Sequence, residues 1–519
     1  MFMGMPKKHI AVIDLGSNSV RVVIYAIDEC GAIHKLDDLK RTLRLSSYID
    51  KIGFIVERGI TELLQCLKQF KQLCQSWDVD HIKGAATAAL RQARNGREIL
   101  FRIVKETGIH LDILSGMEEA RYGFLAVRHT MDIDEAIIVD VGGGSTEISY
   151  MKERRLLHSI SLPFGAVNMT DRYFRGIETV PQKYIDQVLI DFYHELSKVH
   201  WLAGKQCPLI GLGGTARSLA AIHQAKVRYS FDNIHHYQMA AYDIKLLVEY
   251  LRKVPLARRS TIEGLSSGRE DIIIGGSVIF AAILEYCDLE ALYISNYGLR
   301  DGICYEILQQ ETASLHIDDA ISNYVKHFAY YKINQNHAEH VRHLSVGLYQ
   351  QLVAEKIITA RAADMLLLQI AAYLHDVGRT INIHSAHSHT FYLLTNVNIP
   401  RLTHKQQIMI ALIASYKKTK VLRERMVQFS DILEESDELS IHQMGTIVLL
   451  ARSLDRTVSE QTLGVRLLKE GNQYVLECSV KRKNSLEIDL AGDWLKRFKK
   501  YFGYDLSIRP IKNGQGKNS

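Results

Sequence analysis

Two segments of the sequence share a pattern that suits phosphate chemistry. Each is an apolar run that ends in Asp-x-Gly and continues into small polar residues, at VIDLGSNSVR (Val12 to Arg21) and at VDVGGGSTE (Val139 to Glu147). Aspartate carboxylates bind divalent cations, and small residues let backbone N–H groups approach an anion closely. Two such turns facing each other across a cleft would hold a phosphate chain and its metal from both sides.

A third glycine turn adds further candidate ligands. In LIGLGGTARSLA the turn precedes a helix-like stretch, and the amino terminus of a helix offers free N–H groups to a phosphate. A single turn of this kind is equally compatible with an ordinary hairpin. A second alternative is that one of the two aspartates does no more than cap its own turn. Three turns in one chain favour phosphate binding. The predicted metal ligands are Asp14 and Asp140, and the predicted substrate-binding residues of the turns are Gly16, Ser17, Asn18, Ser19, Gly142, Gly143, Gly144, Ser145, Thr146, Gly213, Gly214 and Thr215.

The first two turns are expected to join strands. Short apolar runs at residues 10–13 and 20–25 flank the first turn, and the segment 136–150 repeats the arrangement around the second. In P-loop NTPases and Rossmann folds the phosphate turn opens a helix and carries GxxxxGK[ST] or GxGxxG. Neither signature occurs in this chain.

Length and composition indicate a multi-domain enzyme without a membrane span. A chain of 519 residues is too long for one core, so three or four domains are expected. No apolar stretch reaches the roughly 18 residues that a transmembrane helix needs, and the first ten residues lack the apolar core of a signal peptide. Seven cysteines without a CxxC pair indicate reduced thiols and a cytoplasmic location. The net charge of +6 favours a polyanionic substrate.

Seven strings of the chain, in order and spacing, resemble the Ppx/GppA phosphatase family over about residues 8 to 310. They are IDLGSNSVR, ATAALRQARN, SGMEEA, VDVGGGSTE, SLPFGAVNMT, GLGGT and GLRDG. The members of this family are exopolyphosphatases and guanosine pentaphosphate phosphohydrolases. The resemblance implies an α/β fold of the actin-like, sugar-kinase and Hsp70 type, in which two RNase-H-like lobes enclose the active site. It also implies a homodimer.

The segment ILSGMEEARYGF separates the roles of two adjacent glutamates. Ser115 and Glu118 have the spacing of a capping box, which leaves Glu119 free to face the cleft. The resemblance implies the same position for the catalytic base. We therefore expect Glu119 to orient and deprotonate the attacking water.

Several arginines are candidate phosphate ligands, because arginine binds phosphate in a bidentate manner. Arg21 and Arg91 lie inside the matching strings, Arg269 lies in GLSSGRED, and Arg300 lies in GLRDG. A solvated surface position is the alternative for each of them.

The chain becomes helical in pattern from about Ser314 to Leu468. His337 and the pair His375 and Asp376 resemble the HD phosphohydrolase superfamily, in which a His, a His-Asp pair and a later Asp bind a divalent metal. Where that pattern expects LADxL, this chain reads LLARSLDR, with Arg452 at the matching place and Asp455 further on. A cation facing a metal is repulsive, so we favour a degenerate domain with an internally hydrogen-bonded cluster. Metal-dependent hydrolysis at this cluster is the alternative.

These observations lead to a specific prediction. The expected architecture is α/β, with actin-like lobes at residues 1–130 and 131–310, an all-α HD-like domain at 311–460 and a small α+β domain at 461–519. The expected activity is that of a Mg²⁺-dependent exopolyphosphatase acting on inorganic polyphosphate, with guanosine pentaphosphate phosphohydrolase as the alternative. A kinase or chaperone-like switch is less favoured, because Glu119 and the string SGMEEA match the hydrolase pattern and no large peptide-binding β domain is expected after the second lobe. A non-enzymatic polyphosphate-binding module is less favoured, because Asp14, Glu119 and Asp140 are all present. No specific nucleic-acid partner is expected.

Overall fold

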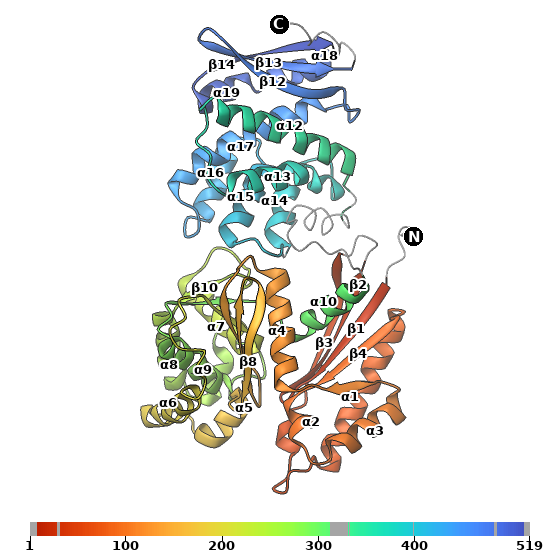
Figure 1. Cartoon of the computed structure of the whole chain (residues 1–519), viewed down its shortest axis with the longest axis vertical. Coiled ribbons are helices and arrows are strands. Elements are labelled where there is room, and N and C mark those ends of the chain that lie inside the picture. The colour runs from red at the N-terminus through yellow and green to blue at the C-terminus, as the bar shows by residue number, and fades with distance from the viewer. Residues whose placement is uncertain are drawn as a thin grey trace. The chain divides into compact units, whose positions relative to one another are not determined.

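The computed structural model describes residues 8–27, 32–311, 331, 333–397, 399–481 and 485–512. They fall into two compact units, Met1–His316 and Ile317–Ser519 (Figure 1). Each unit is considered by itself.

The first lobe of the amino-terminal unit is built on a five-stranded sheet. Its elements are β1 (Lys8–Leu15), β2 (Ser19–Ile27), β3 (Ile33–Thr42), α1 (Glu57–Ser76), β4 (His81–Ala86), α2 (Ala88–Gln92), α3 (Gly96–Thr107), β5 (Leu111–Ile113) and α4 (Gly116–Thr130), with a 3-10 turn at Leu45–Tyr48. The strand order is β3-β2-β1-β4-β5, in which β1, β2 and β3 are antiparallel and β1, β4 and β5 are parallel.

The second lobe repeats this topology in a six-stranded sheet. Its order is β10-β11-β9-β6-β7-β8, again with an antiparallel meander beside parallel strands. The elements are β6 (Ala136–Val141), β7 (Thr146–Lys152), β8 (Arg155–Leu162), α5 (Ala166–Met169), α6 (Gln182–Leu196), β9 (Leu209–Leu212), α7 (Gly213–Val227), β10 (Gln238–Ala240), α8 (Ala241–Lys253), α9 (Ile273–Tyr286), β11 (Ala291–Ile294) and α10 (Leu299–Glu311), with a π-helical turn at Thr170–Phe174 and a 3-10 turn at Leu256–Thr261.

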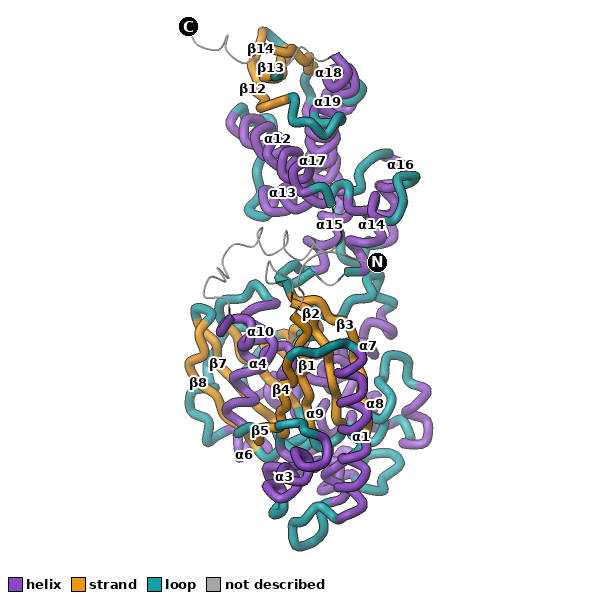
Figure 2. The backbone as a smooth tube through the Cα atoms, turned by 90° about the vertical axis from the view of Figure 1, so that its right-hand side faces the viewer, coloured by secondary structure: helices purple, strands orange, loops and turns teal. Residues whose placement is uncertain are grey.

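Both faces of β1 are buried from Ile10 to Ile13, which explains the unbroken apolar run in this part of the strand. Successive side chains of a strand point to opposite faces. Ala11 and Ile13 join the core formed with α1 and α3, whereas Ile10 and Val12 join a second core that contains residues of α4, β6 and α10. Figure 2 shows the strands of this unit with helices on both sides. These cores fix the ends of β1 and β6, where the functional turns lie.

The carboxy-terminal unit is helical and ends in a small sheet. Its helices are α12 (Gln335–Ala354), α13 (Asp364–Leu374), α14 (Ala386–Asn396), α15 (His404–Ala414), α16 (Thr419–Gln428) and α17 (Glu435–Leu454), with a 3-10 turn at Val377–Thr380. A sheet of order β12-β13-β14 follows. Its elements are β12 (Thr462–Glu470), β13 (Gln473–Val480), α18 (Ser485–Gly492), α19 (Leu495–Phe502) and β14 (Asp505–Lys512).

The predicted architecture of two α/β lobes, a helical region and a small α+β segment is confirmed. The domain boundaries at residues 130, 310 and 460 stay predictions, and residues 312–330 of the predicted helical domain lie outside the described part of the chain. Within the described residues, no helix has both the length and the apolar character that crossing a membrane requires.

Candidate active site

The first unit contains a cavity of about 410 Å³ whose wall includes all three glycine turns. The predicted residues that line it are Asp14, Gly16, Ser17, Asn18, Ser19, Arg21, Glu119, Asp140, Gly142, Gly143, Gly144, Ser145, Gly213, Gly214 and Arg269. The three turns are far apart in the sequence. The fold therefore brings most of the predicted site together.

The first two turns are equivalent hairpins. In each, the glycine after the aspartate donates its backbone N–H to a serine carbonyl three residues on, at 3.0 Å from Gly16 to Ser19 and at 2.9 Å from Gly142 to Ser145. Leu15 pairs with Val20 in the first hairpin, and the equivalent residues of the second pair in the same way. The duplicated sequence pattern is thus a duplicated structure.

The two hairpins approach each other closely. A Cβ on Gly143 would lie 2.9 Å from Cβ of Ser17, and a Cβ on Gly144 would lie 3.2 Å from Oγ of Ser17. Gly165 lies against the backbone of Gly143, where a Cβ would come within 2.4 Å of the carbonyl oxygen. A side chain on Gly143 would push the two turns apart, and one on Gly165 would clash with the backbone of the second turn, so both positions favour glycine.

Glu119 occupies the first turn of α4, and the predicted capping box holds that turn. The backbone N–H of Ser115 donates to Oε2 of Glu118 at 2.7 Å, and the backbone N–H of Glu118 donates to Oγ of Ser115 at 3.2 Å. Glu118 is therefore occupied at the helix end, as predicted. The neighbouring Glu119 lines the cavity, and its side chain is only 12% exposed.

Arg91 holds the Glu119 carboxylate in place. Its Nη1 donates both to Oε1 of Glu119 and, at 2.6 Å, to the carbonyl of Leu114. Arg91 is not among the residues that line the cavity. We therefore interpret this arginine, which the sequence placed among the phosphate ligands, as a positioning residue for the predicted base.

Burial and mutual repulsion raise the pKa values of the carboxyl groups in the cavity. Burial is the largest cause for Glu119 and Glu147, and the charge of Glu147 adds to the increase at Glu119, although Arg91 opposes it. Burial also raises the pKa of Asp140, with a contribution from the charge of Asp14. Such displaced pKa values are typical of functional sites.

Cations form the other part of the wall. Lys40, Arg217 and Arg300 line the cavity together with Arg21 and Arg269. Burial lowers the pKa of Arg217 to about 10, and the charges of Arg300, Arg21 and Arg269 contribute. The pKa of Lys40 is lowered in the same way, by burial and then by the surrounding arginines. This mutual repulsion makes the cavity a favourable place for a polyanion.

Some of the predicted ligands have protein partners. Arg300 donates to Oδ2 of Asp14 at 2.7 Å, and Arg21 forms a bidentate ion pair with Asp38. Thr146 and Thr215 are fully buried and do not line the cavity. The Thr146 hydroxyl donates to the carbonyl of Phe164, whereas the Thr215 hydroxyl accepts from Arg269 at 3.5 Å. The two threonines therefore support the turns from the side that faces away from the cavity.

Of the charged residues that line the cavity, five were not predicted from the sequence, namely Lys35, Lys40, Glu147, Arg217 and Asp301. A signal for Glu147 existed. It pairs with Asp140 in the second hairpin as Arg21 pairs with Asp14 in the first, so the duplication places both side chains at equivalent positions. No comparable signal marked Lys40 or Arg217.

The carboxylates of the cavity suit a hard divalent cation such as Mg²⁺, which prefers oxygen ligands. Asp140 lines the cavity, and no hydrogen bond or ion pair of its side chain is found within the described ranges. A Cβ on Gly213, where φ is +80°, would lie 2.3 Å from Oδ1 of Asp140, so this glycine keeps the carboxylate accessible. The donor set therefore fits the ion that the sequence predicts.

Gly214 gives a test of the cationic wall. A Cβ at this position would lie 1.8 Å from Nη2 of Arg269, so Gly214→Ala should displace that flexible guanidinium while α7 stays folded. Because a hydrogen bond to a charged group contributes about 1.5 to 3 kcal/mol, the KM for a phosphorylated substrate should rise about tenfold or more. Steady-state kinetics with a thermal melt would measure both effects. Gly347→Ala, in α12 with open space around the glycine, is the control and should leave KM unchanged.

Comparison with known proteins gives consistent results. Residues 23–311 match the model of the Ppx/GppA phosphatase family, and residues 322–502 match the model of Ppx/GppA phosphatase domain III. A guanosine-5'-triphosphate,3'-diphosphate pyrophosphatase from Pseudoalteromonas atlantica is 25% identical over 454 residues, which are 86% of each chain.

Solved structures are similar to somewhat more than half of this chain. The Aquifex aeolicus member of the Ppx/GppA family is 31% identical, with a TM-score of 0.53, and the match covers 60% of this chain and all of that one. An exopolyphosphatase from Cytophaga hutchinsonii is 25% identical, with a TM-score of 0.54, over 58% of this chain and 98% of its own.

Proposed function

Because this chain belongs to the Ppx/GppA phosphatase family, whose members hydrolyse phosphoanhydride bonds, we propose that it is an exopolyphosphatase that releases terminal phosphates from inorganic polyphosphate. The observation that carries this proposal is the cavity itself, in which three glycine turns, a cluster of cations and the buried Glu119 converge. Phosphoryl transfer needs positioning and charge neutralisation more than covalent chemistry by the protein. The wall of the cavity supplies both.

The chain's own residues account for the main steps. Glu119, held by Arg91, accepts a proton from water as the water oxygen attacks the terminal phosphorus. The bond from that phosphorus to the bridging oxygen breaks, and the shortened chain leaves with the bridging oxygen. Lys40, Arg217 and Arg269 stabilise the negative charge of the phosphates. Mg²⁺, held by Asp14 and Asp140, would supply further charge neutralisation when bound.

The lining of the cavity favours polyphosphate over a guanosine nucleotide. Among the described residues that line it, none is aromatic, so no ring is available there to stack on a base. Guanosine pentaphosphate remains the second candidate substrate, because the Pseudoalteromonas relative carries the name of a guanosine pentaphosphate hydrolase and matches most of this chain. A homodimer and a cytoplasmic location are further parts of the proposal. The location is supported by six described cysteines, which are all buried and of which no two form a disulfide with each other.

Side-by-side kinetics would separate the two substrates. Phosphate release from long-chain polyphosphate and from guanosine pentaphosphate should be measured with the same preparation, at the same Mg²⁺ concentration. We expect kcat/KM to be at least about tenfold higher for polyphosphate, which corresponds to roughly 1.4 kcal/mol of discrimination. A higher value for guanosine pentaphosphate would reject the polyphosphate assignment. Loss of both activities in a Glu119→Gln preparation would exclude a contaminating phosphatase.

A further inference from the structure

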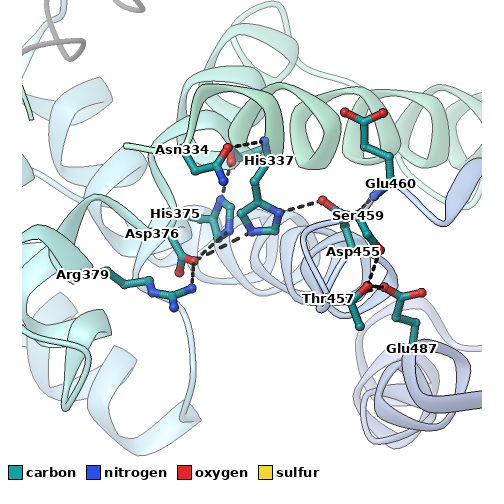
Figure 3. A network of polar contacts seen from close by, with 11 residues as sticks. Asn334, His337, His375, Asp376, Arg379, Asp455, Thr457, Ser459, Glu460 and Glu487 are labelled. Atoms are coloured by element: carbon teal, nitrogen blue, oxygen red, sulfur yellow. Dashed lines mark hydrogen bonds and ion pairs between the residues drawn. The ribbon is translucent and has the colours of Figure 1, made fainter. Parts of the chain in front are cut away.

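The helical unit contains a polar cluster built around two histidines (Figure 3). Nδ1 of His337 lies 2.7 Å from Oδ2 of the fully buried Asp455, and Nδ1 of His375 lies 2.7 Å from the carbonyl of Ala372. The Nε2 atoms of both histidines lie 3.8 Å from Oδ2 of Asp376. The predicted internal hydrogen bonding of this cluster is thus present for both histidines.

The spacing of these groups would permit a metal ion to bind, but the arginines that contact Asp376 oppose it. Ligand atoms of His337, His375 and Asp376 lie within 4.8 Å of one another. However, Oδ1 of Asp376 is bound by Arg452 at 2.8 Å, and Oδ2 by Arg379 at 2.9 Å. Both carboxylate oxygens therefore already face a cation. A divalent ion placed here would be repelled by Arg452, so the residues do not fit the metal that the HD resemblance implies.

A cavity of about 150 Å³ borders this cluster. Asp376 is the one carboxylate among the described residues that line it, against the cations Arg452 and Lys417. Lys417 is exposed, and no acidic partner of its side chain lies within the described ranges. Because two cations face one carboxylate, the lining has a net positive charge. The cavity is therefore suited to an anion.

His375 adds a requirement on that anion. It lines the cavity, its side chain is only 2% exposed, and its Nε2 has no hydrogen-bond partner. Because Nδ1 faces a carbonyl oxygen, Nδ1 carries the proton and Nε2 is left as an acceptor. A ligand that suits this site is an oxyanion that still carries an O–H group, which can donate a hydrogen bond to Nε2 of His375.

We propose that this cavity is a binding site for inorganic phosphate, with Arg452 and Lys417 facing the charged oxygens and Nε2 of His375 accepting the hydrogen bond of the P–OH group. The arginine that replaces the last aspartate of the HD pattern converts a metal site into an anion site. The inference concerns the helical unit alone and stands whether or not the other unit hydrolyses polyphosphate.

A single-tryptophan form of the full chain makes the site observable. The sequence has three tryptophans, of which Trp494 lines the cavity, so Trp77→Phe with Trp201→Phe leaves one local reporter. Titration with inorganic phosphate should change the Trp494 fluorescence saturably. Sulfate, which has no proton to donate near neutral pH, should bind about tenfold more weakly, because it leaves Nε2 of His375 unpaired. A phosphomonoester dianion also lacks the proton and should behave like sulfate.

Variants of two nearby arginines provide the contrast, namely Arg452 in the last turn of α17 and Arg456 in the turn that follows this helix. Arg452→Gln should weaken phosphate binding at least about tenfold. Arg456→Gln removes an exposed cation that does not line the cavity, and it should bind phosphate like the parent. Hydrogen exchange of the unmodified chain gives an independent readout, since phosphate should slow exchange in residues 375–387 of the wild type but not of Arg452→Gln.

Several outcomes would overturn the inference. They are a fluorescence response that does not saturate, equal affinity for phosphate and sulfate, and an Arg452→Gln variant that binds phosphate like the parent. Elemental analysis adds another arm. A stoichiometric transition metal in the wild-type chain that is lost in His375→Ala would show a metal site, whereas Arg452→Asp should be the variant that gains one.

Discussion

Replacing Glu119 with glutamine should lower the rate of phosphate release by about 10²- to 10⁴-fold, the range that a general base typically contributes. Glutamine keeps the size of the side chain and can still contact Arg91, so the fold should be retained. However, the amide cannot accept a proton from water. Phosphate release at saturating substrate, with circular dichroism and a thermal melt as checks on folding, would measure the effect. Near-normal turnover would remove Glu119 from the mechanism.

The adjacent glutamate is a matched control. Glu118→Gln changes the same functional group one residue earlier, but Glu118 is engaged in the capping box. This variant should lose up to about 1 kcal/mol of stability and keep its turnover. A large loss of activity in Glu118→Gln would mean that the two glutamates were assigned the wrong way round.

The pH profile offers a second readout of the same base. A general base acts only when it is deprotonated, so kcat/KM should fall as the pH drops through the pKa of Glu119. Burial and the charge of Glu147 raise that pKa, so the acidic limb should lie above the ordinary carboxyl value of 4.5. In Glu119→Gln the residual activity should lack this limb.

Replacing Asp140 with asparagine should weaken the response to Mg²⁺ by at least about 10- to 100-fold, the loss that follows even from changes to groups that only support metal ligands. The substitution removes a carboxylate that faces the cavity without a protein partner among the described residues. Activity measured against Mg²⁺ concentration should show a half-saturation point shifted upward. An unchanged metal requirement would leave Asp140 with a structural role only.

Asp132→Asn is a suitable control for this variant. Asp132 precedes β6 and its side chain is 75% exposed, where it faces Arg154 at 3.5 Å. Ion pairs at such exposed sites contribute little, so neither stability nor the Mg²⁺ response should change appreciably. A shift of equal size in both variants would indicate a general effect of charge on the protein.

The sequence predicted the parts of the site that are local in the chain. The two Asp-led hairpins, the strand-to-helix turn at Gly213 and the capping box at Ser115 each depend on neighbouring residues, and the structure contains all of them. Backbone geometry at a glycine turn is set within a few residues, so such patterns are readable without the fold.

The partners of the charged residues were not readable in this way. Arg300 and Asp14 are separated by 286 positions, and only the packing of α10 against β1 brings them together. Arg91 of α2 contacts Glu119 of α4, a partner 28 positions away that the sequence does not indicate, and its role as a phosphate ligand stays a prediction. Lys40 belongs to a polar strand and Arg217 to the first turn of a helix, where the sequence does not indicate which face is turned to the cavity. Charge pairing of this kind depends on tertiary contacts.

The two hairpins are alike in backbone but opposite in charge at one pair of equivalent positions, Arg21 in the first and Glu147 in the second. The charge in the cavity is therefore distributed unevenly between the two hairpins, although their backbones are equivalent. The cations of the cavity wall would attract a linear polyanion most strongly, while its terminal phosphate lies beside the carboxylates. We therefore expect cleavage to start at the end of the polyphosphate chain and to remove one phosphate at a time. A cavity with a symmetric charge distribution would not favour entry of the chain by its end.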